Sequence, residues 1–366
     1  MCSRALHPLL PSLPLLLALG AFGCGPKTVS VKAADVKTVA VRPRSGQPVF
    51  CPGAPFEVEV VAQMVNGDTC STTTAQRCEG SDKALLDKRQ IVVVGSDSIF
   101  EPETMLLRPS GDVFQTAAGV ELKGWVLGAE QKAGVTRLKP VYDCLATSEY
   151  DGGYGGQGPS VEVAATKIDT PYYKHATLVR IRSDGFPPRY VIAPQGMVVR
   201  VFAAGGPGLP GEDGASGQQG AQGAAGSQCG NGGAGGAGTN GGPGGPGGDG
   251  GPGGLIVAMI DNAAFGEISA QLDLETPGGD PGPGGRGGAG GAGGAGGSAG
   301  SSDDKRCPSG GVAGPAGPSG TQGQDGADGR PGPDGPAPKV VPVARAAIFA
   351  EEMAKIEKVE GLARQQ

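Results

Sequence analysis

The chain has 366 residues and a formal net charge of -6, and its composition is dominated by 71 glycines and 32 prolines. With an isoelectric point near 5.1 it offers no basic patch, which excludes nucleic acid as a partner. It has two histidines, no P-loop and no cysteine spacing typical of zinc sites, so we expect no enzymatic activity, no cofactor and no metal. The composition indicates a structural or binding protein.

Residues 1–23 read as a secretion signal. The apolar stretch from Ala5 to Phe22 is short and interrupted by three prolines, unlike a membrane-spanning helix. The small residues before Cys24 resemble a bacterial lipobox. This resemblance implies that Cys24 is the mature N-terminus and carries lipid, with palmitate among its acyl chains, which would tether the protein to a membrane. By the same resemblance, Gly25 implies the outer membrane, on its periplasmic or extracellular face. The alternative is cleavage after Gly23 without lipidation.

Six cysteines remain once Cys2 is removed with the signal and Cys24 carries lipid. An even number in an exported chain predicts three disulfides, although sequence does not determine their connectivity. Two of the six lie in breaks of the glycine repeat and would meet if both breaks lie at one end of a bundle; otherwise each is free or pairs between chains. The predicted pairs are Cys70 with Cys78, Cys51 with Cys144, and Cys229 with Cys307.

Residues 34–204 have an ordinary composition and predict a β-sandwich. Short apolar and β-branched runs recur between turn residues, and no helix alternates with them. About 170 residues are enough to bury a core. The predicted strands span residues 36–41, 56–65, 91–94, 120–127, 135–142, 161–168, 178–181, 190–192 and 197–202.

One loop of this region, residues 149–160, is long and rich in glycine. Tyr150 and Tyr154 make it a candidate binding loop, because tyrosines on flexible loops serve as recognition surfaces. The alternative is a disordered connection.

From Gly205 to Gly335 glycine recurs at every third position in four runs. We name residues 205–228 run 1, 232–254 run 2, 279–300 run 3 and 311–336 run 4. Glycine is mostly single in runs 1 and 4 and mostly doubled in runs 2 and 3. A polyproline II strand has three residues per turn and no internal hydrogen bonds, so one glycine per turn allows one close neighbouring face and two allow two. The pattern predicts a bundle with two inner and two outer strands, about 75 Å long.

The single-glycine runs resemble bacterial collagen-like proteins. The doubled runs are similar to the polyglycine II bundles of the snow flea antifreeze protein and of phage tail-tip adhesins. Two alternatives stay open: a collagen triple helix of three chains and a flexible tract. Residues 205–336 hold 50 glycines but only 14 prolines, and a trimer does not require doubled glycine, so we favour a monomeric bundle.

Two further elements complete the expected fold. Residues 255–276 contain an apolar run and an alternating run, which predict a β-hairpin between runs 2 and 3. Residues 343–366 predict a C-terminal helix with an apolar stripe and with Glu351 and Lys355 as an i,i+4 pair. The stripe could dock on the β-domain or mediate self-association, and we favour docking. The fold class is therefore mainly β, with a glycine-rich bundle and a short terminal helix.

These elements predict a non-enzymatic cell-surface lipoprotein that acts as a structural spacer or an adhesion scaffold. Its expected partners are the membrane, through the lipid anchor, and surface glycans or other envelope proteins. Two other functions remain open. The antifreeze resemblance implies ice binding, and the β-domain could bind a ligand on the cell envelope.

Overall fold

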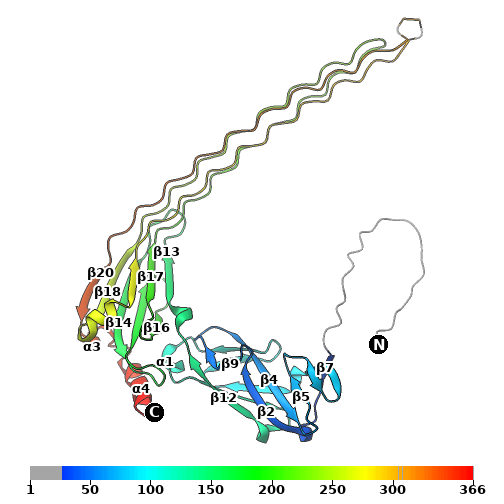
Figure 1. The fold of residues 1–366 in the computed structure, drawn as a ribbon. Helices are drawn as coiled ribbons and strands as arrows, with labels where there is room; N and C mark the ends of the chain where they lie inside the picture. Colours follow the sequence, from blue (N-terminus) through cyan, green and yellow to red (C-terminus); the bar gives the residue numbers. More distant parts are fainter. Residues whose placement is uncertain (1–26, 304, 307, 366) are drawn as a thin grey trace.

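The computed structural model describes residues 27–303, 305–306 and 308–365. It is mainly β-structure in several sheets with a short C-terminal helix, as predicted. Two β-rich units lie side by side, and a long arm made by the glycine-rich runs rises from the second of them (Figure 1). All nine strands predicted from the sequence are present.

Three sheets share one core in the N-terminal unit. Their strand orders are β1-β7-β6, β2-β4-β10-β9 with β5 beside β4, and β3-β12-β11-β8. The strands are β1 (Lys27–Val29), β2 (Val36–Pro43), β3 (Val49–Phe50), β4 (Phe56–Met64), β5 (Thr69–Ser71), β6 (Gln76–Cys78), β7 (Ser81–Leu86), β8 (Ile91–Gly95), β9 (Ser98–Glu101), β10 (Leu106–Pro109), β11 (Val120–Val126) and β12 (Gly134–Pro140). The short helices are η1 (Ala33–Asp35), η2 (Lys88–Gln90) and η3 (Glu130–Lys132). Helix α1 (Val113–Thr116) lies in the same part of the chain but packs against the second unit.

The second unit is a sandwich of two sheets, ordered β13-β17-β19 and β16-β15-β14-β18-β20. Its core lies between them and holds residues that precede run 1 together with residues that lie between runs 2 and 3. The elements are η4 (Asp143–Leu145), β13 (Thr147–Asp151), β14 (Ser160–Ile168), β15 (Ala176–Ser183), β16 (Arg189–Ala193), β17 (Val199–Ala204), β18 (Leu255–Asp261), η5 (Asn262–Ala264), α2 (Phe265–Ser269), β19 (Leu272–Glu275) and β20 (Lys339–Val343).

The prediction of a single β-domain over residues 34–204 is therefore wrong in one respect. The first core ends at Leu138, whereas the second needs β18, β19 and β20 from beyond residue 204. The five-stranded sheet is buried on both faces, so β14 needs an apolar neighbour on each side, and β18 supplies the second one. The sequence of residues 34–204 could not predict this pairing, because β18 follows β14 only about 90 residues later in the chain.

The predicted hairpin over residues 255–276 is also wrong. β18 pairs in parallel with β14 and β20, whereas β19 pairs in parallel with β17 in the other sheet, and α2 lies between them in the chain. The apolar run Leu255–Asp261 fits a strand inside a doubly covered sheet, as its buried Ile256 and Ala258 show. The segment therefore connects the two layers of the sandwich.

The C-terminal segment docks on the outer face of the five-stranded sheet, as predicted. It forms two helices, α3 (Arg345–Ile348) and α4 (Met353–Arg364), rather than one. The break turns Phe349 and Glu352 toward the sheet, where both are almost fully buried. The predicted pairing of Glu351 with Lys355 does not form, because each side chain finds a partner on another element, Arg182 and Asp112 respectively.

The four runs lie side by side and exchange backbone hydrogen bonds at nearly every third residue. Glycine N–H groups of run 1 donate to carbonyls of run 3, and those of run 2 donate to runs 1 and 4. Run 3 donates to run 2, and run 4 donates to run 3. Runs 2 and 3 thus each bond to three neighbours, whereas runs 1 and 4 each bond to two. The doubled-glycine runs are the ones with more neighbours.

Glycine is required in these runs to different degrees. A Cβ on Gly244, the first glycine of a pair in run 2, would overlap the Gly285 carbonyl of run 3. A Cβ on the adjacent Gly245 would lie 3.2 Å from the Glu212 nitrogen, where a small shift accommodates it. Thr239 naturally occupies this second slot, and its hydroxyl accepts a hydrogen bond from the Gln218 N–H at 2.7 Å.

We therefore expect Gly244→Ala and Gly245→Ala to differ strongly although the residues are adjacent. Gly244→Ala should destabilise the bundle by about 2 kcal/mol through overpacking and accelerate amide exchange in runs 2 and 3. Gly245→Ala should change stability by less than about 1 kcal/mol, since Ala also reduces the freedom of the unfolded chain. Hydrogen exchange and thermal unfolding measure both effects, and equal behaviour of the two variants would contradict the packing.

Candidate functional site

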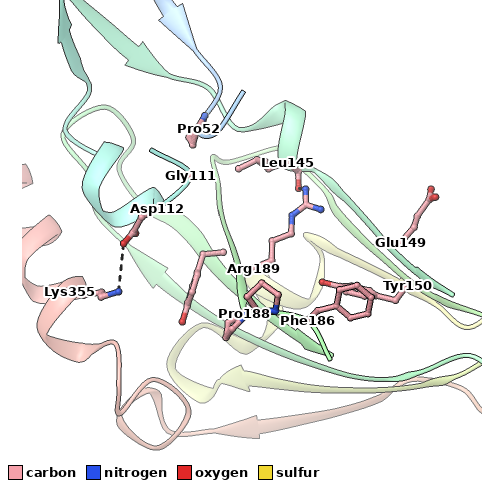
Figure 2. Close-up of a pocket in the computed structure, with 12 residues that line it drawn as sticks. Pro52, Gly111, Asp112, Leu145, Glu149, Tyr150, Phe186, Pro188, Arg189 and Lys355 are labelled. Carbon is pink, nitrogen blue, oxygen red and sulfur yellow. Dashed lines mark hydrogen bonds and ion pairs between the residues drawn. The ribbon is translucent and has the colours of Figure 1, made fainter. Parts of the chain in front are cut away.

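A pocket of about 680 Å³ lies where the two β-rich units and helix α4 meet. The close-up view shows side chains from all three pointing toward it (Figure 2). Its lining combines aromatic, proline and charged side chains, which is typical of a ligand site. The lining residues are Pro52, Gly111, Asp112, Leu145, Glu149, Tyr150, Phe186, Pro187, Pro188, Arg189, Tyr190 and Lys355.

One end of the pocket is aromatic. Phe186 stands on the turn between β15 and β16, is 60% exposed and meets Tyr150 edge to face with ring centroids 5.7 Å apart. Pro187 and Pro188 follow it and restrict the backbone of the turn. Burial raises the pKa of Tyr150, and the nearby Arg189 charge opposes this rise only in part. The Tyr150 hydroxyl is therefore neutral at physiological pH.

The remainder of the pocket carries two acidic and two basic side chains. Lys355 Nζ lies 3.7 Å from a carboxylate oxygen of Asp112. Arg189 donates to the Leu145 carbonyl at 3.3 Å, which holds its guanidinium across the pocket. Among the described residues, neither the Glu149 carboxylate nor the Tyr150 hydroxyl has a hydrogen-bond or ion-pair partner. The pocket thus offers free donors and acceptors without a net charge.

The predicted binding loop divides into two parts. Tyr150 belongs to β13 and lines the pocket, whereas Tyr154 is 70% exposed and lies outside its lining. The loop between them and β14 is bonded to the root of the bundle. Gly155 N–H donates to the Pro207 carbonyl at 2.7 Å, and Gly158 N–H donates to Pro252 at 2.8 Å. Its glycines allow close backbone packing, so the loop supports the arm, a role that we did not predict.

A buried ion cluster holds α4, and with it Lys355, against the sandwich. Arg180 donates to both carboxylate oxygens of Glu352, at 3.0 and 2.9 Å, and the Tyr190 hydroxyl donates to Glu352 at 2.7 Å. Burial alone would raise the pKa of Glu352, but hydrogen bonds from Tyr190 and Arg180 and the charges of Arg180 and Arg182 lower it. Burial and the contact with Glu352 raise the pKa of Tyr190 to about 12.

This cluster makes the unfolding free energy depend on pH at both extremes. Because the folded pKa of Glu352 is lowered, its contribution is present at neutral pH and is lost as pH falls below the ordinary carboxyl range. Because the folded pKa of Tyr190 is raised, stability falls as pH rises from about 10 toward 12. Glu352→Gln should cost about 3 kcal/mol at pH 7, since it removes the bidentate partner of the buried Arg180 and leaves only the partly exposed Glu162 carboxylate, 3.1 Å away.

Urea unfolding at several pH values measures these dependences. Tyr190→Phe is the matched control, because it should remove the part of the alkaline dependence that Tyr190 causes, while Tyr142, Tyr150 and Tyr173, whose pKa values burial also raises, keep theirs. The acid dependence should become smaller without disappearing, since Glu352 loses the Tyr190 hydrogen bond but keeps Arg180. An unchanged acid dependence in Glu352→Gln would contradict the assignment of that dependence to this cluster.

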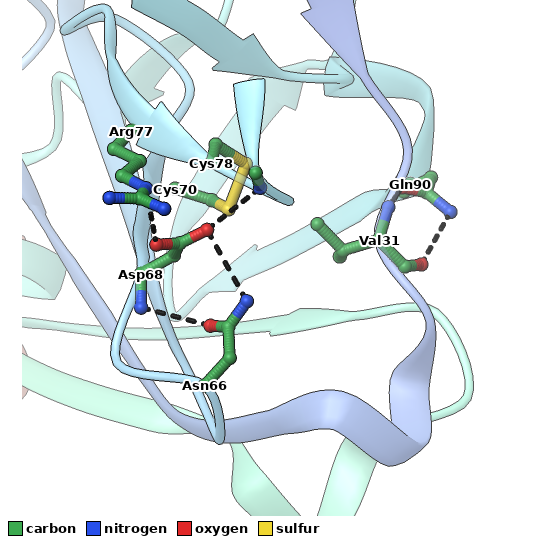
Figure 3. Close-up of a disulfide and its surroundings, with 8 residues drawn as sticks. Val31, Asn66, Asp68, Cys70, Arg77, Cys78 and Gln90 are labelled. Atoms are coloured by element: carbon green, nitrogen blue, oxygen red, sulfur yellow. Dashed lines mark hydrogen bonds and ion pairs between the residues drawn. A yellow bond between two sulfur atoms is a disulfide. The ribbon is translucent and has the colours of Figure 1, made fainter. Parts of the chain in front are cut away.

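Two predicted disulfides are confirmed. Cys70 and Cys78 are bridged with their Cα atoms 4.8 Å apart, beside an ion pair of Arg77 with Asp68 at 3.3 Å (Figure 3). Cys51 and Cys144 are bridged with a Cα separation of 6.3 Å. This second bridge closes a separation of 93 residues, for which the chain-entropy model gives roughly 4 to 5 kcal/mol. It joins the end of β3 in the first unit to η4 in the second, next to the pocket.

The remaining predicted site residues are Cys229, Cys307 and Cys24. Cys229 is disulfide-bonded, and its N–H donates to Ser301, so the two turns of the bundle lie at one end. Its predicted partner Cys307 lies outside the described residues, as does Cys24, so that pairing and the lipidation stay predictions. Within residues 27–365, as far as the structure describes them, no group of His, Cys, Asp or Glu could hold a metal ion. No described helix is long and apolar enough to cross a membrane.

Sequence reasoning missed most of the pocket. An exposed aromatic in the turn Gly185-Phe186-Pro187 was the one available signal, since turns rarely carry a large apolar side chain without a reason. Lys355 and Asp112 had no signal, because only the fold brings α4 to the first unit. No family model, curated protein or solved structure matches the chain, so its geometry alone supports a function.

Proposed function

We propose that this chain is a non-enzymatic surface lipoprotein whose sandwich presents the four runs as a stiff polyglycine II arm. The arm acts as a structural spacer or an adhesion scaffold. A lipid on Cys24 tethers the protein to the outer membrane, and its partners are surface glycans or envelope proteins.

The observation that carries the proposal is the continuity between the sandwich and the arm. β17 leads into run 1 and β19 into run 3, and these two strands pair in parallel. Runs 2 and 4 lead back into β18 and β20, which also pair in parallel. Each layer of the sandwich thus extends into two bonded runs of the arm. A rod anchored in this way is stiff, unlike a glycine-rich linker that behaves as a random coil.

The distribution of charge along the arm supports an adhesive use. In the half next to the sandwich, aspartate carboxylates accept hydrogen bonds from backbone N–H groups that do not bond to a backbone carbonyl of a neighbouring run. Examples are Asp325 with Gly287 at 2.7 Å and Asp249 with Arg330 at 2.8 Å. The outer half has no charged side chain in residues 214–228, 232–248, 287–300 or 311–324. Along these stretches a neutral surface of small side chains can approach another surface without charge repulsion, whereas the sequence between runs 3 and 4 carries Asp303, Asp304, Lys305 and Arg306.

Matched deletions test whether the arm is one bonded rod. Removing residues 217–222, 234–239, 289–294 and 315–320 takes two triplets from each run and keeps every remaining donor opposite its acceptor. We expect the maximum dimension from small-angle scattering to fall by roughly 19 Å, with amide protection of the remaining arm retained. Removing residues 217–220 alone, which is not a whole number of triplets, shifts the glycine frame of run 1 and should abolish the protection of run 1 beyond the deletion. Similar protection in both variants would contradict the rod.

Metabolic labelling with palmitate tests the anchor. We expect label in the full chain and its loss in Cys24→Ala, because a thioether-linked lipid needs that sulfur. Cys2→Ala, which changes the other cysteine of the signal region, is the matched control and should stay labelled. A full chain without label would refute the tether and leave the arm unaffected.

A further inference from the structure

We propose that the pocket at the junction of the two units binds a neutral polysaccharide, one sugar ring of which packs on Phe186. This rests on the proposed adhesive function and names the chemistry of the partner. The shape of the pocket, its aromatic end and its balance of charge support this assignment.

The aromatic end provides a platform for a sugar ring. A pyranose presents a face of C–H groups that packs on an aromatic ring, and an exposed, conformationally restricted phenylalanine suits this contact. Phe186 is 60% exposed, and its turn is restricted by the two prolines that follow. The edge-to-face contact with Tyr150, at 5.7 Å, supports the ring from one side. Phe186 is thus held in place although most of it is in solvent.

The polar groups select a neutral ligand with many hydroxyls. Asp112 and Glu149 balance Arg189 and Lys355, so a ligand of either sign meets repulsion as well as attraction. Sugar hydroxyls both donate and accept, which matches carboxylate acceptors, cationic donors and the Tyr150 hydroxyl together. A peptide requires partners for its backbone, and the Leu145 carbonyl beside the pocket already accepts from Arg189. The lining therefore favours a saccharide over a peptide.

The size and openness of the site fit a chain rather than a single small molecule. The volume of about 680 Å³ exceeds that of one hexose and is reached from solvent along the exposed Phe186, Pro187 and Pro188. The lining continues from Phe186 past Arg189 to the Lys355–Asp112 pair (Figure 2). Two or three consecutive sugar units would contact both units of the protein.

Calorimetric titration of the full chain with neutral hexasaccharides tests the proposal. The probes are cellohexaose, mannohexaose and chitohexaose, with polygalacturonate and a decaproline peptide as comparisons. We expect at least one neutral hexasaccharide to bind with a dissociation constant below about 1 mM. Phe186→Ala should weaken that binding at least tenfold, and Tyr150→Phe, which keeps the ring, should weaken it about threefold.

Tyr154→Ala is the matched control, since Tyr154 is a similarly exposed aromatic outside the pocket. It should leave binding unchanged, and thermal unfolding should show that all variants are folded. Equal affinities of Phe186→Ala and Tyr154→Ala, no binding of any neutral hexasaccharide, or tighter binding of decaproline or polygalacturonate would each overturn the proposal. The variant with all four runs shortened should bind the hexasaccharide normally, which separates failure of the pocket from failure of the arm.

Discussion

The structure depends on hydrogen bonds between backbones that approach more closely than any side chain permits. Along the arm, a glycine N–H of one run donates to a carbonyl of another at 2.7 to 3.0 Å in nearly every triplet. The missing Cβ is what allows this, as the overlap of Gly244 with the Gly285 carbonyl shows. The arm has almost no apolar core, so these bonds replace the burial that stabilises ordinary domains.

The sandwich lowers the entropic cost of assembling the arm, because it holds the ends of the four runs next to one another. Four unstructured glycine runs would lose much conformational entropy on assembly. Here β17, β18, β19 and β20 already place the run ends in two layers and in register. The loop that follows β13 adds further backbone bonds at the root through Gly155 and Gly158. Only the far turns then need to be closed, and Cys229 lies in one of them.

The junction of the two units is held by covalent and ionic contacts that also shape the pocket. The Cys51–Cys144 bridge fixes one wall, and the Arg180–Glu352 pair fixes α4. Both lie next to lining residues, Pro52 and Leu145 in the first case and Tyr190 in the second. The pocket is therefore as rigid as the junction, and a site between two units with this support is preorganised for binding.

The sequence by itself determined the β-rich class, nine strands and the four runs, because alternation and glycine period are local patterns. It predicted two of the cysteine pairs without determining their connectivity, and the structure bridges both. Only the tertiary structure decided that β18, β19 and β20 complete a second sandwich, that residues 255–276 are no hairpin, and that Phe186, Asp112 and Lys355 share a pocket. Those features depend on which distant segments meet. A local pattern shows that a strand needs a neighbour, but not which one the chain will bring.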